Sequence, residues 1–121
     1  MIKKVYTLSS CDTSKRILKE SGILDSGFEI IDIKDNGISK DELEEMKALS
    51  GSYESLFSKR AQRYKSMGLK DKNLTEEDIR DLILSHYTFL KRPVVIIGDR
   101  IFTGNAKKNV AALTEAIKSL S

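Results

Sequence analysis

Hydrophobic residues in this chain fall into short clusters whose spacing predicts strands and helices. An apolar run from Ile2 to Leu8 predicts a first buried strand, and Thr13 to Gly22 predicts a helix that ends at the glycine. A second apolar run, residues 28–33, precedes Asp35-Asn36-Gly37 and predicts a second strand followed by a turn. A strand, a helix and another strand form a βαβ unit, so we expect these two strands to be parallel.

The middle of the chain carries repeated helix signals without a strand pattern. Ser39 and Glu42 have the spacing of a capping box, and apolar residues then recur at helical intervals, which predicts a helix. Residues 51–68 mix apolar and basic positions at spacings that suit short helices. Thr75 and the acidic residues after it begin a further helix. His86 shows no catalytic partner in the sequence and is interpreted as the end of that helix.

The last third of the chain predicts a hairpin and a final helix. The β-branched run Val94 to Ile97 is followed by the turn signal Gly98-Asp99 and a partner strand from Arg100 to Thr103, which should be antiparallel. Apolar residues then recur on one face of a predicted helix, at Val110, Leu113, Ile117 and Leu120. The element order is β-α-β, a block of helices, and β-β-α. This order predicts an α/β domain.

Composition excludes several classes of protein. The 121 residues suffice for one compact domain, and a formal net charge of +3 is too small to recruit nucleic acid by charge alone. No apolar stretch is long enough to span a membrane, and the start of the chain does not resemble a secretory signal. The single cysteine and the single histidine predict no intrachain disulfide and no structural metal site. We therefore expect a soluble cytoplasmic protein with a reduced thiol.

Cys11 is the strongest candidate for chemistry, because it lies between the first predicted strand and the first predicted helix. Backbone N–H groups and the positive end of the helix dipole favour the thiolate there, and the thiolate is the reactive form. The alternative is a buried, inert cysteine. Pro93, the only proline, directly precedes an apolar strand. It suits either an ordinary strand start or a cis bond that directs its loop toward a neighbouring site.

Three motifs together resemble one protein family. They are Cys11-x-Thr13-Ser14-Lys15, the segment Leu56-Phe57-Ser58-Lys59-Arg60 with Tyr64 and Gly68-Leu69 after it, and Lys91-Arg92-Pro93. This combination resembles the arsenate reductase ArsC family, which includes the Spx-type regulators and the YffB-type proteins. The resemblance implies a thioredoxin-like fold with a four-stranded mixed sheet and an inserted helical block. It also implies a single domain over 1–121, with its core in 1–38 and 87–121 and the insertion in 39–86.

The resemblance also implies roles for individual residues. Cys11 would be the nucleophile, Arg92 would bind an oxyanion or the thiolate, and Pro93 would be cis and face the cysteine. Thr13, Ser14 and Lys15 would contribute to substrate binding. Arg60 fits an arginine of the Spx and YffB branches, whereas Ser58 stands where the reductases have an arginine. A planar guanidinium can hold an oxyanion by two bonds, although a surface ion pair is the commoner use of an arginine.

Other family positions differ in this chain. Thr7-Leu8-Ser9 replaces the reductases' His-Asn-Pro, and Phe102-Thr103-Gly104-Asn105-Ala106 lacks the arginine expected there. Ser14 stands where a dithiol protein has its second cysteine, so Cys11 cannot close a local disulfide.

The resemblance implies an arsenate reductase-like oxidoreductase with no bound cofactor and with glutathione or glutaredoxin as its thiol partner. Arsenate or another oxidised or glutathionylated molecule is the expected substrate. The alternative is a Spx-like regulator that binds the RNA polymerase α-subunit without turnover.

Overall fold

The computed structural model describes residues 2–120, apart from the side chains of residues 35 and 36. The chain divides into two compact units, with boundaries between Asp35 and Asn36 and between Lys91 and Arg92. The unit formed by both ends of the chain is called the sheet unit, and the unit formed by Asn36–Lys91 is called the helical unit. Among the described residues, no helix has both the length and the apolar character that crossing a bilayer requires.

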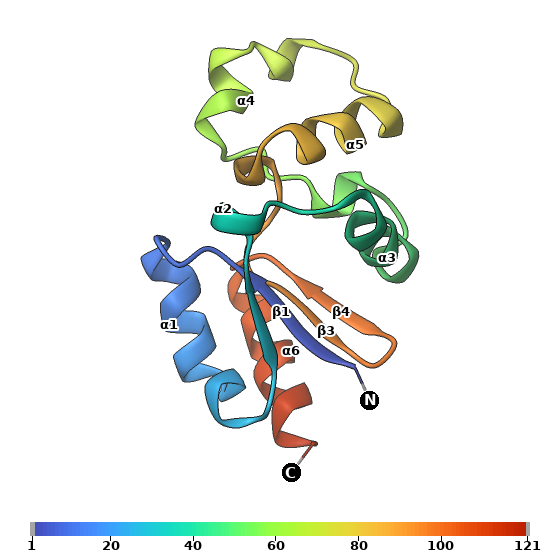
Figure 1. Ribbon diagram of the computed structural model, residues 1–121. Helices are drawn as coiled ribbons and strands as arrows, with labels where there is room; N and C mark the ends of the chain where they lie inside the picture. The colour runs from blue at the N-terminus through green and yellow to red at the C-terminus, as the bar shows by residue number, and fades with distance from the viewer. Residues whose placement is uncertain (1, 121) are drawn as a thin grey trace. The chain divides into compact units, whose positions relative to one another are not determined.

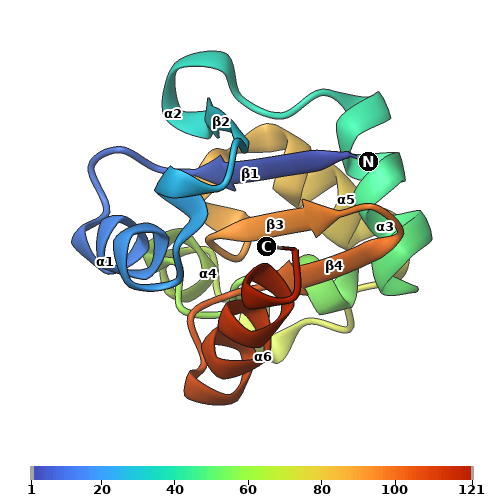
Figure 2. The same ribbon diagram turned by 90° about the horizontal axis from the view of Figure 1, so that it is seen from below.

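The sheet unit contains a mixed four-stranded sheet in the order β2-β1-β3-β4 (Figure 2). Strand β1 pairs in parallel with β2 and antiparallel with β3, and β3 pairs antiparallel with β4. The predicted βαβ unit and the hairpin at Gly98-Asp99 are therefore confirmed, as is the α/β fold class. The strands are β1 (Lys3–Thr7), β2 (Glu29–Asp32), β3 (Val94–Ile97) and β4 (Arg100–Thr103).

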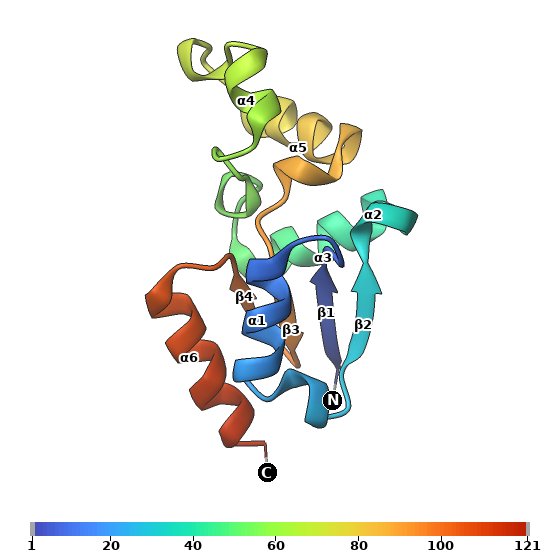
Figure 3. The ribbon, with the colours of Figure 1, turned by 90° about the vertical axis from the view of Figure 1, so that its left-hand side faces the viewer.

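Two helices, α1 (Asp12–Glu20) and α6 (Lys107–Lys118), pack on the same face of this sheet (Figures 1 and 3). Their apolar sides and the alternate residues of the strands form one hydrophobic core, because side chains of a strand alternate between its two faces. The buried members are Val5, Ile17, Leu18, Ile23, Val95, Ile97, Phe102, Leu113, Ala116 and Ile117. A short 3-10 helix, η1 (Ile23–Asp25), connects α1 to β2.

The end of β2 differs from the sequence prediction. Residues Asp35-Asn36-Gly37 were predicted to form a turn after a strand that included Ile33, but the structure has one helical turn, α2 (Ile33–Asn36). Two local features explain the early end of the strand. The Asp32 carboxylate accepts a hydrogen bond from the backbone N–H of Lys34 at 2.9 Å, which bends the chain. Ile33 remains buried, so the helical turn keeps the apolar side chain covered.

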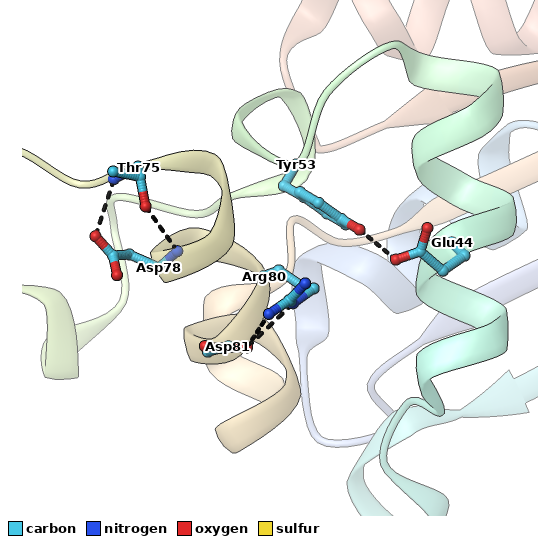
Figure 4. Close-up of polar contacts among 6 residues, drawn as sticks. All are labelled: Glu44, Tyr53, Thr75, Asp78, Arg80 and Asp81. Atoms are coloured by element: carbon cyan, nitrogen blue, oxygen red, sulfur yellow. Dashed lines mark hydrogen bonds and ion pairs between the residues drawn. The ribbon is translucent and has the colours of Figure 1, made fainter.

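The helical unit is built from α-helices and short 3-10 helices. The predicted capping box of Ser39 and Glu42 forms at the start of α3. A second capping box, of Thr75 and Asp78, starts α5 (Figure 4). The elements are α3 (Lys40–Ser50), η2 (Glu54–Leu56), α4 (Gln62–Ser66), η3 (Leu69–Asp71), α5 (Glu76–Ser85) and η4 (Tyr87–Phe89). His86 ends α5, as predicted, and it also begins η4.

Polar contacts connect α3, η2 and α5 within the helical unit. The hydroxyl of Tyr53 donates to the Glu44 carboxylate (Figure 4), and this bond raises the pKa of the phenol. The Glu76 carboxylate accepts from the backbone N–H groups of Tyr53 at 2.7 Å and of Glu54 at 3.1 Å. Charged acceptors at the first turn of η2 satisfy N–H groups that have no partner inside so short a helix.

Leu113→Ala tests the core of the sheet unit. Leu113 is 1% exposed, so its truncation should lower the free energy of unfolding by about 2–5 kcal/mol. Leu24, which is 54% exposed in the same unit, provides the matched control, and Leu24→Ala should change stability by less than about 0.5 kcal/mol. Urea unfolding followed by circular dichroism measures both values. Equal losses in the two variants would contradict the assignment of the core.

Candidate active site

Cys11 occupies the N-cap of α1, at the end of the loop that follows β1. Its backbone is extended, with φ −96° and ψ 109°, and its carbonyl accepts from the Lys15 N–H at 3.1 Å. The Cys11 N–H donates to the Leu8 carbonyl at 2.9 Å, which closes a turn directly after the strand. An N-cap side chain usually accepts a hydrogen bond from the second or third residue of its helix. The Cys11 sulfur therefore stands where a capping oxygen usually lies.

The pKa of the Cys11 thiol is lowered from its ordinary value. Burial of the sulfur raises this pKa, but the hydroxyl and backbone N–H of Ser14, followed by the charge and N–H donors of Arg92, lower it by more. Ser14 is the third residue of α1, so its N–H is one of the donors that the start of a helix leaves unpaired. These groups favour the thiolate, and Cys11 is partly exposed, so a reactant can approach this residue.

The donors around Cys11 are buried and lack acceptors of their own. The Ser14 hydroxyl and the Nε and Nη1 atoms of Arg92 make no hydrogen bond of regular length and angle. These same donors nevertheless lower the pKa of the thiolate. Buried polar groups are normally satisfied, because leaving one without a partner costs about 1–3 kcal/mol. Such groups beside a reactive atom can accept charge or oxygen that arrives during a reaction.

Arg92 is held by the peptide bond that follows it and by the start of β3. The Arg92–Pro93 bond is cis, as the resemblance implies, and the Pro93 carbonyl accepts from the Gly104 N–H at 2.9 Å. Strand β3 begins at Val94, which pairs with Tyr6. Continuing that register by one residue places Pro93 opposite Thr7, at the end of β1 that leads to Cys11.

Two residues near Cys11 were not recognised as site residues in the sequence. The Thr7 hydroxyl is buried and has no hydrogen-bond partner. The pKa of Asp32 is lowered, first by the hydroxyl of Ser9 and then by the Lys34 N–H, so its carboxylate holds the loop that carries Cys11. The predicted parallel pairing of β1 and β2 contained a signal for Asp32, because Thr7 and Asp32 are partners at adjacent strand ends.

The other predicted site residues lie at different places. Thr13 is half-buried and Lys15 is exposed, and both flank the buried Ser14 on the first turn of α1. Arg60 is exposed and belongs to the helical unit. Within that unit, Ser58 N–H donates to the Phe89 carbonyl at 2.7 Å, and Lys91 N–H donates to the Leu56 carbonyl at 2.8 Å. Among residues 2–120, no group of His, Cys, Asp and Glu side chains could hold a metal ion.

Sequence comparison gives a consistent result over most of the chain. The model of the ArsC family matches residues 6–113. An arsenate reductase from Acidiphilium multivorum is 31% identical over 102 residues, which cover 80% of this chain and 71% of that protein. An arsenate reductase from Escherichia coli is 32% identical over 102 residues, with the same coverage of both chains.

Solved structures have the same thioredoxin-like fold. The arsenate reductase from Vibrio cholerae superposes with a TM-score of 0.77 at 18% identity and covers 93% of this chain and 98% of its own. An ArsC family related protein from Bacteroides fragilis also gives a TM-score of 0.77, at 22% identity and with the same coverage. At these identities, the likeness shows the fold alone.

Ser14→Ala tests the cause of the lowered pKa of Cys11. The substitution removes a hydroxyl donor to the thiolate, so the pKa should rise and the rate of iodoacetamide alkylation should reach half its maximum at a higher pH. In the unaltered protein this midpoint should lie below about 8.5, the ordinary pKa of a free cysteine.

Ser21→Ala is the matched control for this experiment. Ser21 is also buried, but it lies at the other end of α1, where its hydroxyl donates to the Leu18 carbonyl. Its substitution should leave the midpoint in place. Equal shifts in the two variants, or none in Ser14→Ala, would show that the Ser14 hydroxyl does not set the pKa.

Proposed function

The chain belongs to the ArsC family, and we propose that it is an arsenate reductase-like oxidoreductase in which Cys11 is the nucleophile. The observation that carries this proposal is the position of Cys11 at the N-cap of α1, where Ser14 and Arg92 favour its thiolate. A partly exposed thiolate whose pKa is lowered by its neighbours can attack an electrophilic centre without a separate base. The family and its reductase members supply the expected class of reaction.

With arsenate as substrate, the reaction can be written from the groups present. The Cys11 sulfur attacks arsenic and forms a sulfur–arsenic bond, and one arsenate oxygen leaves as water after protonation. The N–H donors of Arg92 bind the remaining oxygens, because a guanidinium presents two parallel donors to an oxyanion. A glutathione thiolate then attacks the Cys11 sulfur, the sulfur–arsenic bond breaks, and its electron pair reduces arsenic from the pentavalent to the trivalent state.

The mixed disulfide left on Cys11 requires a second external thiol. Cys11 is the single cysteine of the chain, and Ser14 occupies the position three residues later. A second glutathione, or the thiol of a glutaredoxin, attacks the glutathione sulfur and releases the Cys11 thiolate. We therefore propose glutathione or glutaredoxin as the thiol partner. The same cycle serves another oxidised or glutathionylated substrate.

A coupled assay tests the proposed function. Oxidation of NADPH by glutathione reductase measures arsenate reduction in the presence of glutathione and glutaredoxin, and Cys11→Ser should abolish it. Arg92→Lys keeps the charge but loses the planar pair of donors, so kcat/KM should fall by about tenfold or more. Arg100→Lys is the matched control: Arg100 is exposed on β4 over the Phe102 ring, and its substitution should leave the rate unchanged.

A Spx-like regulator is the competing proposal, and Arg60, which fits the Spx and YffB branches, favours it. This function needs a protein contact with the RNA polymerase α-subunit and no turnover. Pull-down with the C-terminal domain of that subunit separates the two proposals. Binding without reduction of arsenate or of a glutathionylated substrate would support the regulator, and turnover without binding would support the enzyme.

A further inference from the structure

The Thr7 hydroxyl is a buried donor that the stabilisation of the thiolate does not require. Thr7 is 5% exposed, its Oγ1 atom has no hydrogen-bond partner, and it is not among the groups that shift the pKa of Cys11. Ser14 is 1% exposed, and its hydroxyl also lacks a regular partner. The thiolate can accept from the Ser14 hydroxyl, but the buried Thr7 hydroxyl has no such acceptor and carries a desolvation cost. A group that forms or arrives there during function would offset this cost.

Strand alternation and helix periodicity place these two hydroxyls on facing surfaces. Val5 belongs to the core together with Ile17 of α1, so Thr7, two residues later, points from β1 toward the same side. Ser14 precedes Ile17 by one helical turn and therefore lies on the same face of α1. The layer of Val5 and Ile17 is thus followed by a layer of Thr7 and Ser14, at the end of the sheet where Cys11 begins α1.

The chemistry of the donors defines what can satisfy them. The hydroxyls of Thr7 and Ser14 and two N–H groups of Arg92 are closed to bulk water, so an acceptor must be small. An oxygen bonded to, or in contact with, the Cys11 sulfur would add a small acceptor beside these donors. Arg92 is the cation among the groups that lower the pKa of Cys11, and the oxygen of a neutral reactant needs no further positive charge there.

We propose that Cys11 also reduces small hydroperoxides, with Thr7, Ser14 and Arg92 donating hydrogen bonds to the two oxygens. The Cys11 sulfur attacks the terminal oxygen of the hydroperoxide, a sulfur–oxygen bond forms, and the oxygen–oxygen bond breaks. The inner oxygen leaves with the bonding electron pair and takes a proton from water. Cys11 is oxidised to a sulfenic acid, which keeps the hydroxyl of the peroxide, and the peroxide is reduced to an alcohol or to water.

Return of the sulfenic acid to the thiolate rests on the proposed function. A glutathione thiol attacks the sulfenic sulfur, water leaves, and a glutathione mixed disulfide forms on Cys11. A second glutathione attacks this disulfide, and glutathione disulfide leaves. Two glutathione molecules thus supply the two electrons. The first step needs no glutathione, so it can be measured apart from the rest of the cycle.

The test compares two reactions of the same thiol in the full chain. Hydrogen peroxide and iodoacetamide are reacted separately with the reduced protein, without glutathione, and the sulfenic acid is trapped with dimedone and quantified by mass spectrometry. The ratio of the two rate constants removes the effect of thiolate fraction, which is common to both. We expect this ratio to exceed that of free cysteine by at least about tenfold, because each donor that strengthens in the transition state contributes on that scale.

Thr7→Val and Thr7→Ser identify the donor. The valine variant keeps the shape and should lower the ratio about tenfold, whereas the serine variant keeps the hydroxyl and should restore it. Thr114→Val in α6, where the hydroxyl donates to the Val110 carbonyl at 2.9 Å, is the matched control and should keep the ratio of the unaltered protein. Thermal unfolding of each variant distinguishes a lost donor from a lost fold.

The outcomes separate this proposal from the proposed function. A ratio equal to that of free cysteine, or an equal ratio in Thr7→Val and Thr7→Ser when both are folded, overturns the peroxide proposal. Fast formation of the sulfenic acid that glutathione does not reverse supports the peroxide step and contradicts the glutathione cycle. Arsenate turnover with an ordinary peroxide ratio supports the proposed function alone.

Discussion

The unpaired backbone N–H groups at the start of α1 are the constraint on which the candidate site depends. A helix of nine residues cannot satisfy its first donors internally, and an N-cap side chain normally supplies the acceptor. Here that side chain is a thiol, which accepts poorly until it loses its proton. Loss of the thiol proton therefore does two things at once: it gives the helix N-terminus an acceptor, and it gives the sulfur the charge that a nucleophile needs.

The sheet positions the groups that complete this arrangement. Parallel pairing brings the ends of β1 and β2 together, so Asp32 reaches the loop before Cys11, and antiparallel pairing brings the start of β3 to the same end. The hydrophobic core beneath holds α1 against these strands through Ile17 and Leu18. The end of β1, the end of β2 and the start of β3 are distant in the sequence, and the direction and register of the strands bring them to the same edge of the sheet.

Much of the fold follows from local patterns, whereas the burial of single polar residues does not. The βαβ unit, the hairpin, the capping box of Ser39 and Glu42 and the helix start at Thr75 were predictable because each depends on residues close in sequence. Cys11 was predictable as a candidate because the strand and helix around it are also local. The burial of Thr7 and Ser14 depends on packing between β1 and α1, and sequence periodicity alone does not distinguish such residues from a polar helix start or strand end. The helical turn at Ile33 was missed for a similar reason, since one hydrogen bond to Asp32 ends the strand.

Ser14 also determines whether an oxidised Cys11 would be reduced by a reaction within the chain or by a second molecule. A cysteine at that position could form a disulfide with an oxidised Cys11 at a rate that does not depend on the concentration of external thiol. With a buried serine there, the reduction of oxidised Cys11 needs an external thiol. Its half-life is therefore inversely proportional to the concentration of that thiol. In the proposed cycle, the oxidised fraction of Cys11 therefore rises when the concentration of the external thiol falls.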